Sequence, residues 1–411
     1  MYKKIAYDLY QIFNENAYLS IIINENIKKI DDKNQTLYTK IMYGVVEQKL
    51  ALDYQISFYT KGKRIKPLIK NILRMGIYML DELNIPKYAV VNELVDATKK
   101  IDFHASALVN SILRNYLRDG KKEIDKKDMI NYISIYCSIP YDIVQYLYPT
   151  YQDKLLTYYK SSNHFNHYRI NNLKTNLEEI ITFLNNNNII YEMNNNFIST
   201  PTSLINYDIF KEGKIVSMDY SSMQVIEFLD HYNYNEVLDV ASAPGMKACY
   251  LAEKMNNKGH ITCCDIYLNK INKIKENVNK LGINNIDTLL ADARTYSYPI
   301  KYDLIICDAP CSGLGTINHK PDLKYHLKLD DIKDIINLQE DILNHIKDYL
   351  NDDGIILYST CTINKEENEN QINKFLINNP NFKLIKEQNI SPSELQDGFY
   401  MAIIKKGDNY E

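Results

Sequence analysis

Two cysteines about fifty positions apart are the residues of this chain best suited to covalent chemistry. Cys311 lies in the run Asp308-Ala309-Pro310-Cys311-Ser312-Gly313, and Cys361 lies in Tyr358-Ser359-Thr360-Cys361-Thr362. Each follows a short apolar run typical of a buried strand, and parallel strands bring their carboxyl ends to one edge of a sheet. Two thiols beside an aspartate suit covalent attack on a pyrimidine ring better than they suit a disulfide or a metal site.

A second group of residues suits the binding of a nucleoside-like cofactor. The turn after the expected strand 237–240 reads Ala241-Ser242-Ala243-Pro244-Gly245-Met246-Lys247. Its small residues let a ligand approach the backbone, and the helix that follows offers unpaired N–H groups to a carboxylate, to which Lys247 adds a positive charge. A tight packing turn would explain this run equally well.

Acidic residues at the ends of the next three expected strands favour the binding interpretation. Asp265 can bond both ribose hydroxyls, Asp292 can contact an adenine edge, and Asp308 ends the strand that leads to Cys311. One such aspartate is common as a helix cap, but three in successive strand–helix units are not.

The elements that position these residues fall into three parts. Residues 1–135 carry apolar side chains at helical spacing and predict an all-α bundle. Residues 136–218 indicate a small α+β module with a strand at 168–171, a helix at 177–184 and a hairpin from 189–191 and 197–198. Residues 219–411 alternate strands and helices, which predicts an α/β doubly wound (Rossmann-like) domain with a parallel sheet. After residue 240 its strands are expected at 260–265, 288–291, 302–308, 355–360 and 399–404.

Charge is distributed unevenly along the chain. The net charge is −4, yet residues 1–135 carry 22 Lys and Arg against 16 Asp and Glu, whereas residues 219–411 carry 20 against 29. A basic front portion would attract phosphates, so it suits a nucleic-acid partner, although solvated surface charge explains the pattern equally well.

Composition excludes several classes of protein. The 411 residues are 45% hydrophobic and 24% charged, which is typical of a soluble globular protein, and no apolar run approaches the roughly 18 residues of a membrane span. The amino terminus has no apolar signal core, so we expect a cytoplasmic protein. Seven cysteines without a Cys-x-x-Cys pair exclude a simple disulfide framework, and on this spacing we expect no metal site. His104 and His319 are lone histidines, which we expect to be surface or packing residues rather than catalysts.

At this point the chain resembles the RNA cytosine-5 methyltransferases that use S-adenosylmethionine. The resemblance spans nearly the whole chain. Its first 135 residues are similar to the NusB-like domain of the bacterial Fmu/Sun (RsmB) branch of that family. The runs that carry these likenesses are Val237–Lys247, Asp308–Tyr325, Tyr358–Glu369 and Asp397–Lys405, and, in the front portion, Arg74–Tyr78, Ile85-Pro86, Val91–Glu93 and Val109–Arg114.

The resemblance assigns roles to the residues above. It implies that the turn 241–247, Asp265, Asp292 and Asp308 bind S-adenosylmethionine, which leaves as S-adenosylhomocysteine. It implies that Cys361 adds to C6 of a cytosine, that Cys311 assists removal of the C5 proton and release of the enzyme, and that Asp308 orients the base. A free thiol is mostly protonated at neutral pH, and the sequence does not identify the group that activates Cys361.

The chain departs from the family pattern at a few positions. Ala241 and Met246 stand where Cys and Gly are usual, and Asn318-His319-Lys320 stands for the usual Arg-Arg-His before Pro321-Asp322. Lys320 and Lys324 are expected to contact phosphates. The acidic run 366–369 fits equally a substrate contact and the first turn of a helix.

The resemblance implies an enzyme that methylates C5 of a cytosine in 16S ribosomal RNA, at the position conventionally numbered 967. We expect a monomer, although the sequence does not show whether the protein self-associates. We expect the target base to be turned out of its stack, the bundle to grip RNA backbone, and neither membrane nor DNA to be a partner. A tRNA cytosine-5 methyltransferase and a non-catalytic NusB-like RNA-binding factor are the alternatives. A DNA cytosine-5 methyltransferase would instead use Cys311 as its nucleophile.

Overall fold

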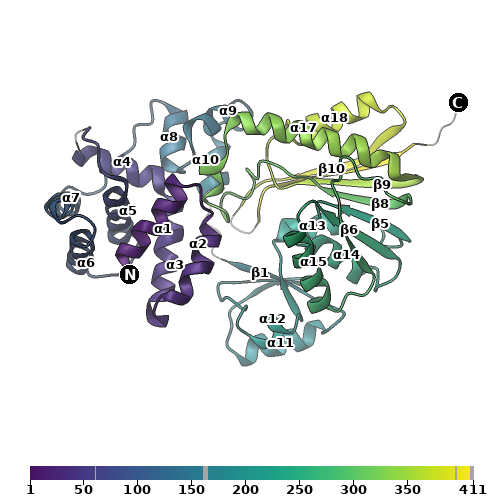
Figure 1. The fold of residues 1–411 in the computed structure, drawn as a ribbon, viewed down its shortest axis with the longest axis horizontal. Coiled ribbons are helices and arrows are strands. Elements are labelled where there is room, and N and C mark those ends of the chain that lie inside the picture. Colours follow the sequence, from purple (N-terminus) through teal and green to yellow (C-terminus); the bar gives the residue numbers. More distant parts are fainter. Residues whose placement is uncertain (61, 161–164, 394–395, 408–411) are drawn as a thin grey trace. The chain divides into compact units, whose positions relative to one another are not determined.

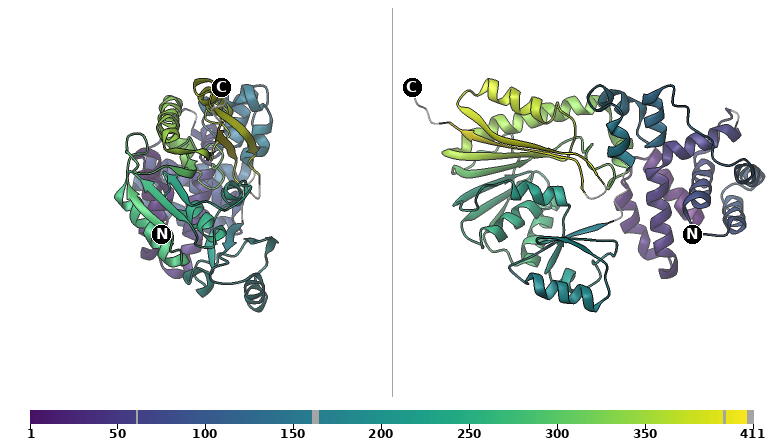
Figure 2. Two further views of the ribbon diagram at one scale, coloured as in Figure 1. Left: turned by 90° about the vertical axis from the view of Figure 1, so that its right-hand side faces the viewer. Right: turned by 180° about the vertical axis from the view of Figure 1, so that it is seen from behind.

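The computed structural model describes residues 1–60, 62–160, 165–393 and 396–407. They form two compact units, one made of residues 1–160 with 320–329 and the other of residues 161–319 with 330–411 (Figures 1 and 2). Among the described residues, no helix combines the length and the apolar character needed to span a bilayer.

The first unit is helical, as the apolar spacing predicts. In α1 the side chains of Ile5, Leu9 and Ile12 recur on one face and are buried in the core of the unit. The helices are α1 (Tyr2–Asn14), α2 (Leu19–Asn26), α3 (Asp32–Glu47), α4 (Lys49–Thr60), α5 (Pro67–Glu82), α6 (Lys87–Lys99), α7 (Ser106–Asp119), α8 (Met129–Tyr136), α9 (Tyr141–Tyr151), α10 (Lys154–Lys160) and α16 (Leu323–His326), with the 3-10 turns η1 (Ile27–Lys29) and η2 (Phe103–Ala105).

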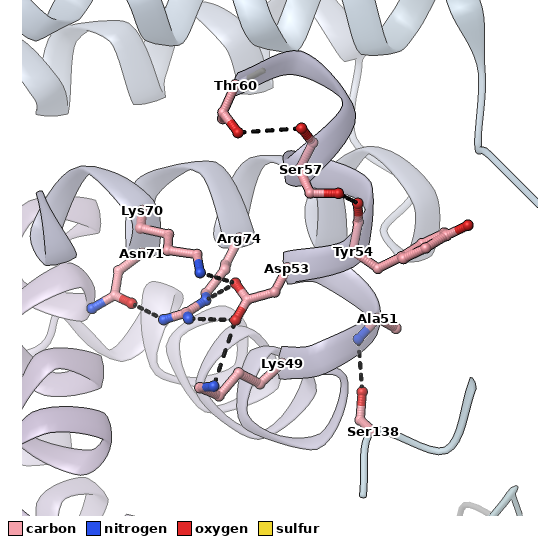
Figure 3. Close-up of polar contacts among 10 residues, drawn as sticks. All are labelled: Lys49, Ala51, Asp53, Tyr54, Ser57, Thr60, Lys70, Asn71, Arg74 and Ser138. Atoms are coloured by element: carbon pink, nitrogen blue, oxygen red, sulfur yellow. Dashed lines mark hydrogen bonds and ion pairs between the residues drawn. The ribbon is translucent and has the colours of Figure 1, made fainter. Parts of the chain in front are cut away.

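Inside this unit one carboxylate holds three cationic side chains (Figure 3). Asp53 on α4 accepts hydrogen bonds of 2.8 and 2.7 Å from Arg74 on α5, and its oxygens lie 3.5 Å from Lys49 Nζ and 3.2 Å from Lys70 Nζ. Burial raises the pKa of Asp53, but the Arg74 hydrogen bonds and the three positive charges outweigh it and leave the pKa below its usual range. The cluster therefore joins α4 to α5 through a carboxylate that is ionised at neutral pH.

The second unit contains a small sheet of four strands in the order β2-β3-β1-β4. It is covered by α11 (Leu177–Asn186) and α12 (Asp208–Lys211), whose buried side chains share one core with it. The strands are β1 (Asn166–Ile170), β2 (Glu192–Asn194), β3 (Phe197–Thr200) and β4 (Ile215–Ser217). The hairpin was predicted, but its first strand lies at 192–194 rather than 189–191. Asn194 pairs directly with Phe197, so the turn has only two residues, and Asn195 in it has a φ of 51°. This short turn places the first strand of the hairpin directly before it, closer to the second strand in sequence than predicted.

A larger sheet of seven strands in the order β10-β11-β9-β8-β5-β6-β7 forms the rest of this unit. Its strands are β5 (Glu236–Val240), β6 (His260–Asp265), β7 (Ile286–Leu290), β8 (Tyr302–Asp308), β9 (Leu350–Thr360), β10 (Phe382–Ile390) and β11 (Phe399–Lys406). The prediction of a parallel sheet holds for β5 to β9 but is wrong for the sheet as a whole, because β11 pairs antiparallel with both β9 and β10. The expected strand at 288–291 begins and ends earlier, at 286–290.

Helices cover both faces of this sheet, which makes it doubly wound (Figure 1). Buried side chains of α13 (Tyr220–Glu227), α14 (Met246–Lys254) and α15 (Leu268–Leu281) share a core with one face, and those of α17 (Leu329–Ile346) and α18 (Glu369–Asn378) share a core with the other. The 3-10 turn η3 (Lys347–Tyr349) leads into β9. The small sheet is tied to this layer by a buried ion pair between Arg169 on β1 and Glu253 on α14.

Candidate active site

Strands β8 and β9 run parallel and end side by side. Asp308, the last residue of β8, pairs with Ser359 of β9, and β9 ends one residue later. Strand β5 lies on the other side of β8, with its last residue, Val240, opposite Cys307. The loop that carries Cys311, the segment that carries Cys361 and the turn 241–247 therefore leave the sheet at the same edge, as the sequence predicts.

The two thiols meet at this edge. The Sγ atoms of Cys311 and Cys361 are 3.3 Å apart, and the backbone N–H of Cys361 also points at Cys311 Sγ, at 3.3 Å. The hydrogen bond with Cys361 and then burial raise the pKa of Cys311 well above its usual value. Cys311 is therefore expected to keep its own proton at neutral pH. The remaining cysteines (Cys137, Cys249, Cys263, Cys264 and Cys307) are buried, as expected of small core residues.

A lysine and an aspartate lie beside the thiols. Lys247 Nζ donates to Asp308 Oδ2 at 2.6 Å, and Ser359 Oγ donates to Asp308 Oδ1 at 2.8 Å. Burial lowers the pKa of Lys247, but the negative charges of Asp308 and of the Cys361 thiolate outweigh it and raise the pKa above its usual value. Lys247 is therefore a partly buried cation that interacts with Cys361, which makes it a candidate for the activating group that the sequence did not reveal.

The turn after β5 is held in a compact conformation by a side-chain hydrogen bond and a glycine. Ser242 Oγ donates to Asp239 Oδ2 at 2.6 Å, and burial raises the pKa of Asp239 to about 7. Gly245 takes the left-handed conformation, φ 87°, and a Cβ there would lie 3.0 Å from the Ile274 side chain. Met246 is the first residue of α14 and needs no unusual backbone, so the Gly to Met departure is accommodated by the glycine before it.

Asp265 ends β6 and is 3% exposed. Its Oδ1 accepts from the backbone N–H of Tyr267 at 3.2 Å, while its Oδ2 makes no hydrogen bond and has only a long contact of 3.5 Å with Lys270 Nζ. A buried carboxylate oxygen without a donor suits hydroxyl groups of a ligand. Beside it Ile266, Tyr267 and Leu268 are 49, 54 and 60% exposed, an apolar run that sequence reasoning did not single out.

Asp292 is placed less directly. It lies two residues beyond the end of β7, and both of its carboxylate oxygens accept from Arg294, at distances down to 2.6 Å. The hydrogen bond from Arg294 lowers the pKa of Asp292. Asp292 thus lies at the expected edge of the sheet, but a ligand that binds its carboxylate would have to compete with Arg294.

A residue that sequence reasoning left undecided, Glu367, joins the two cysteine segments. It is 0% exposed, and its carboxylate accepts from Ser312 N at 2.7 Å, from Ser312 Oγ at 2.5 Å, from Asn364 Nδ2 at 2.9 Å and from Gln339 Nε2 at 3.2 Å. Tyr358 OH donates to its backbone carbonyl at 2.8 Å. Within the run 366–369 only Glu369 belongs to the first turn of α18, and Glu366 and Glu367 precede the helix. Glu367 fixes the loop after Cys311 to the segment after Cys361.

Lys324, an expected phosphate contact, does not lie at a surface. It is 2% exposed and donates to the carbonyl oxygen of Glu47 at 2.8 Å, inside the helical unit. Burial lowers its pKa to about 8. The expectation for Lys324 is therefore wrong.

Comparison with known proteins agrees with this geometry. Residues 226–405 match the model of the family "16S rRNA methyltransferase RsmB/F", and residues 4–118 match that of the "NusB family". The chain is 31% identical to the "Probable ribosomal RNA small subunit methyltransferase B" of Bacillus subtilis (strain 168), with 91% of this chain and 88% of that protein covered. It is 26% identical to the "Ribosomal RNA small subunit methyltransferase B" of Proteus mirabilis (strain HI4320), over 96% of both chains.

Solved structures share the fold. The crystal structure of PH0851 superposes with a TM-score of 0.80 at 23% identity, over 99% of both chains. That of NSun6 from Pyrococcus horikoshii with SFG superposes with a TM-score of 0.56 at 20% identity, over 69% of this chain and 98% of that one.

Proposed function

Because the chain belongs to the ribosomal RNA small subunit methyltransferase B family and is a methyltransferase with an RNA substrate, we propose that it methylates C5 of cytosine 967 in 16S ribosomal RNA, with S-adenosylmethionine as the methyl donor. The observation that carries the proposal is the pair of thiols 3.3 Å apart, beside Lys247 and Asp308, at the edge where β5, β8 and β9 end.

Cytosine C5 is a poor nucleophile because its electrons are part of the ring conjugation. Addition of the Cys361 thiolate to C6 forms a C–S bond and moves an electron pair toward C5, which can then attack the methyl carbon. The positive charge of Lys247 stabilises the thiolate before the addition. Asp308 is placed between Lys247 and Ser359, where its carboxyl group can hydrogen-bond the polar edge of the base.

Release of the product requires loss of the C5 proton. Cys311 is the nearest candidate base, and its raised pKa depends first on its hydrogen bond with Cys361. Once Cys361 is bonded to carbon, its sulfur no longer carries the negative charge that raises the pKa of Cys311, so Cys311 can give its own proton to solvent water and then accept the one from C5. The electron pair of the C–H bond restores the ring double bond, and the Cys361 thiolate leaves.

The residues at the strand ends fit S-adenosylmethionine, which supplies an electrophilic methyl group on a sulfonium. Asp265 presents a buried oxygen without a hydrogen-bond donor, suited to the ribose hydroxyls, and the exposed run 266–268 offers an apolar surface to the adenine. The turn 241–247 offers its backbone at the start of α14 to the amino-acid end. Asp292 would contact the adenine edge after Arg294 moves aside.

The experiment compares RNA from a strain that lacks this gene with RNA from the same strain carrying the wild type, Cys361→Ala or the matched control Cys137→Ala. Bisulfite sequencing should find methylation at 16S position 967 for the wild type and Cys137→Ala and none for Cys361→Ala. Full methylation by Cys361→Ala would overturn the assigned nucleophile, and methylation confined to tRNA would overturn the assigned substrate. With Cys311→Ala, a protein–RNA band that survives denaturing electrophoresis is expected, since the adduct forms but is not released.

A further inference from the structure

Three side chains from distant parts of the sequence meet in the second unit, outside the thiol site. They are His167 on β1, Asp219 at the start of α13 and His319 at the end of the loop that carries Cys311. One nitrogen or oxygen of each lies within 4.8 Å of the corresponding atoms of the other two. The His167 and His319 rings are 6.2 Å apart between centroids and nearly perpendicular, so the two imidazoles converge rather than stack.

Both imidazole rings are oriented from outside the cluster. His167 Nδ1 lies 3.0 Å from Ser199 Oγ, and the ring stacks on Phe197 at 5.3 Å. His319 Nδ1 lies 2.6 Å from Asp397 Oδ1. A histidine held at Nδ1 by a hydroxyl or a carboxylate is the usual arrangement of a metal-binding imidazole, which then coordinates through Nε2.

Asp219 contributes an independent observation. One of its oxygens accepts from the backbone N–H of Ser221 at 2.9 Å, but its Oδ2 is buried and makes no hydrogen bond. A carboxylate oxygen that is buried without a donor is energetically costly, so such an atom indicates a missing partner. With Asp397 nearby, the cluster combines two imidazoles with two carboxylates, an excess of negative charge that a divalent cation would balance.

We propose that His167, Asp219 and His319 bind one divalent transition-metal ion with the preferences of Zn²⁺, with Asp397 as the outer partner of His319. Two imidazole nitrogens and one carboxylate oxygen are a common zinc donor set, and a water molecule would complete the tetrahedron. Zinc ligands at about 2.0–2.2 Å from the ion lie roughly 3.3 Å from one another, so the three atoms, which are now within 4.8 Å of one another, must approach by up to about 1.5 Å on binding.

The position of the site gives it a structural role. His319 ends the loop 309–319, which begins directly after β8 and carries Cys311, while His167 and Asp219 belong to other segments. A bound ion would fix the far end of this loop to β1 and α13. An arginine at position 319 could pair with the carboxylates but would not coordinate a metal, so the proposed site depends on the imidazole of His319.

The test uses the full chain, freed of metal by a chelator, in a Cys311→Ser/Cys361→Ser background so that the thiols cannot bind the probe. Titration with Co²⁺ alone should give the visible absorption of a tetrahedral site at one ion per chain, without the near-ultraviolet band of thiolate ligation. Zn²⁺ should displace Co²⁺ and raise the midpoint of thermal unfolding.

Variants decide whether the signal belongs to this cluster. Asp219→Asn and His319→Arg should lose binding at least tenfold, and Asp397→Asn should weaken it about 10–100-fold, as the loss of an outer partner does. His319→Arg also tests folding, because an arginine can pair with the Asp397 carboxylate that now contacts His319, and its circular dichroism should match that of the parent. Absence of stoichiometric Co²⁺ or Zn²⁺ binding, or equal binding by His319→Arg, would overturn the proposal. These readouts do not involve methylation, so they stand whether or not the proposed function holds.

Discussion

Glu367 provides a sharp test of how the two cysteine segments are held together. Its buried carboxylate accepts four hydrogen bonds of 3.2 Å or shorter, two of them from Ser312. Glu367→Ala removes the acceptor and leaves several donors buried without partners. At about 1–3 kcal/mol for each donor that water cannot reach, we expect a loss of about 3–5 kcal/mol in the free energy of unfolding. Glu367→Gln keeps one acceptor oxygen but turns an amide toward the other donors, so we expect about 1–3 kcal/mol.

The effect on the reaction should exceed the effect on stability. Displacing a reacting group by about 1 Å can cost about 100-fold in rate, and Glu367 fixes the segments that carry both thiols. Denaturant unfolding and single-turnover methylation by folded protein measure the two effects separately. Glu366→Ala is the matched control, because Glu366 is exposed and carries the same charge, and its stability should stay within about 0.5 kcal/mol of wild type. If Glu367→Ala behaved like Glu366→Ala in both assays, the reasoning would be refuted.

Three further predictions concern the loop, the thiols and the helical unit. A Cβ at Gly315 would lie 2.1 Å from a backbone oxygen, so Gly315→Ala should destabilise the chain by about 1–3 kcal/mol in denaturant unfolding, and an unchanged midpoint would contradict the contact. Hydrogen peroxide should take two electrons and two protons from Cys311 and Cys361 to form a disulfide, because their Sγ atoms are 3.3 Å apart. Methylation activity should then be lost, and dithiothreitol should restore it. Inactivation that dithiothreitol cannot reverse would count against disulfide formation. Folding lowers the pKa of Asp53, so its ionised carboxylate stabilises the fold above about pH 4, and this stabilisation is lost as the pH falls through the pKa of the folded state. The difference in free energy of unfolding between wild type and Asp53→Asn should therefore become smaller in acid. A difference that does not change with pH would exclude the ion cluster as its cause.

The central strands were predicted well because buried parallel strands read as continuous apolar runs. The strands 260–265 and 302–308 have the predicted bounds, each ended by an aspartate that marks the carboxyl edge. Strand β10 was missed because its side chains are mostly exposed and it lies at the end of the sheet, where Lys and Glu alternate with apolar residues. Without β10 the antiparallel side of the sheet could not be foreseen.

For the candidate site too, the positions that depend on local sequence were predicted, and the contacts between distant segments were not. The meeting of Cys311 and Cys361 follows from strand register, because each cysteine lies within three residues of the end of its strand. The structural role of Glu367 could not be predicted from the sequence, because its hydrogen-bond donors come from positions 312, 339 and 364, which no local pattern connects. His167 and His319 are likewise lone histidines in sequence, 152 positions apart, and only the fold brings them together.

The helical unit shows why a domain boundary read from sequence can miss part of a domain. Residues 320–329 follow the loop of Cys311 in sequence but complete the helical unit. Asp322 Oδ2 accepts from the backbone N–H of Leu19, the first residue of α2, at 2.8 Å, and Tyr325 packs edge-on against Phe13 and donates to Ser138 O at 3.2 Å. The three-part division of the chain stays a prediction.

This segment can be tested in the full chain. Asp322→Ala removes the acceptor of the Leu19 N–H in the first turn of α2 and should cost about 0.5–2 kcal/mol. Tyr325→Ala removes a partly buried ring that packs against the helical core and should cost about 2–3 kcal/mol, less than a fully buried ring. Amide hydrogen exchange should show the loss of protection in α1 to α3, around Phe13 and Leu19, rather than in the seven-stranded sheet. Exchange that increased only around β8 and β9 would show that these residues stabilise the catalytic sheet, and residues 320–329 would then not be an integral part of the helical unit.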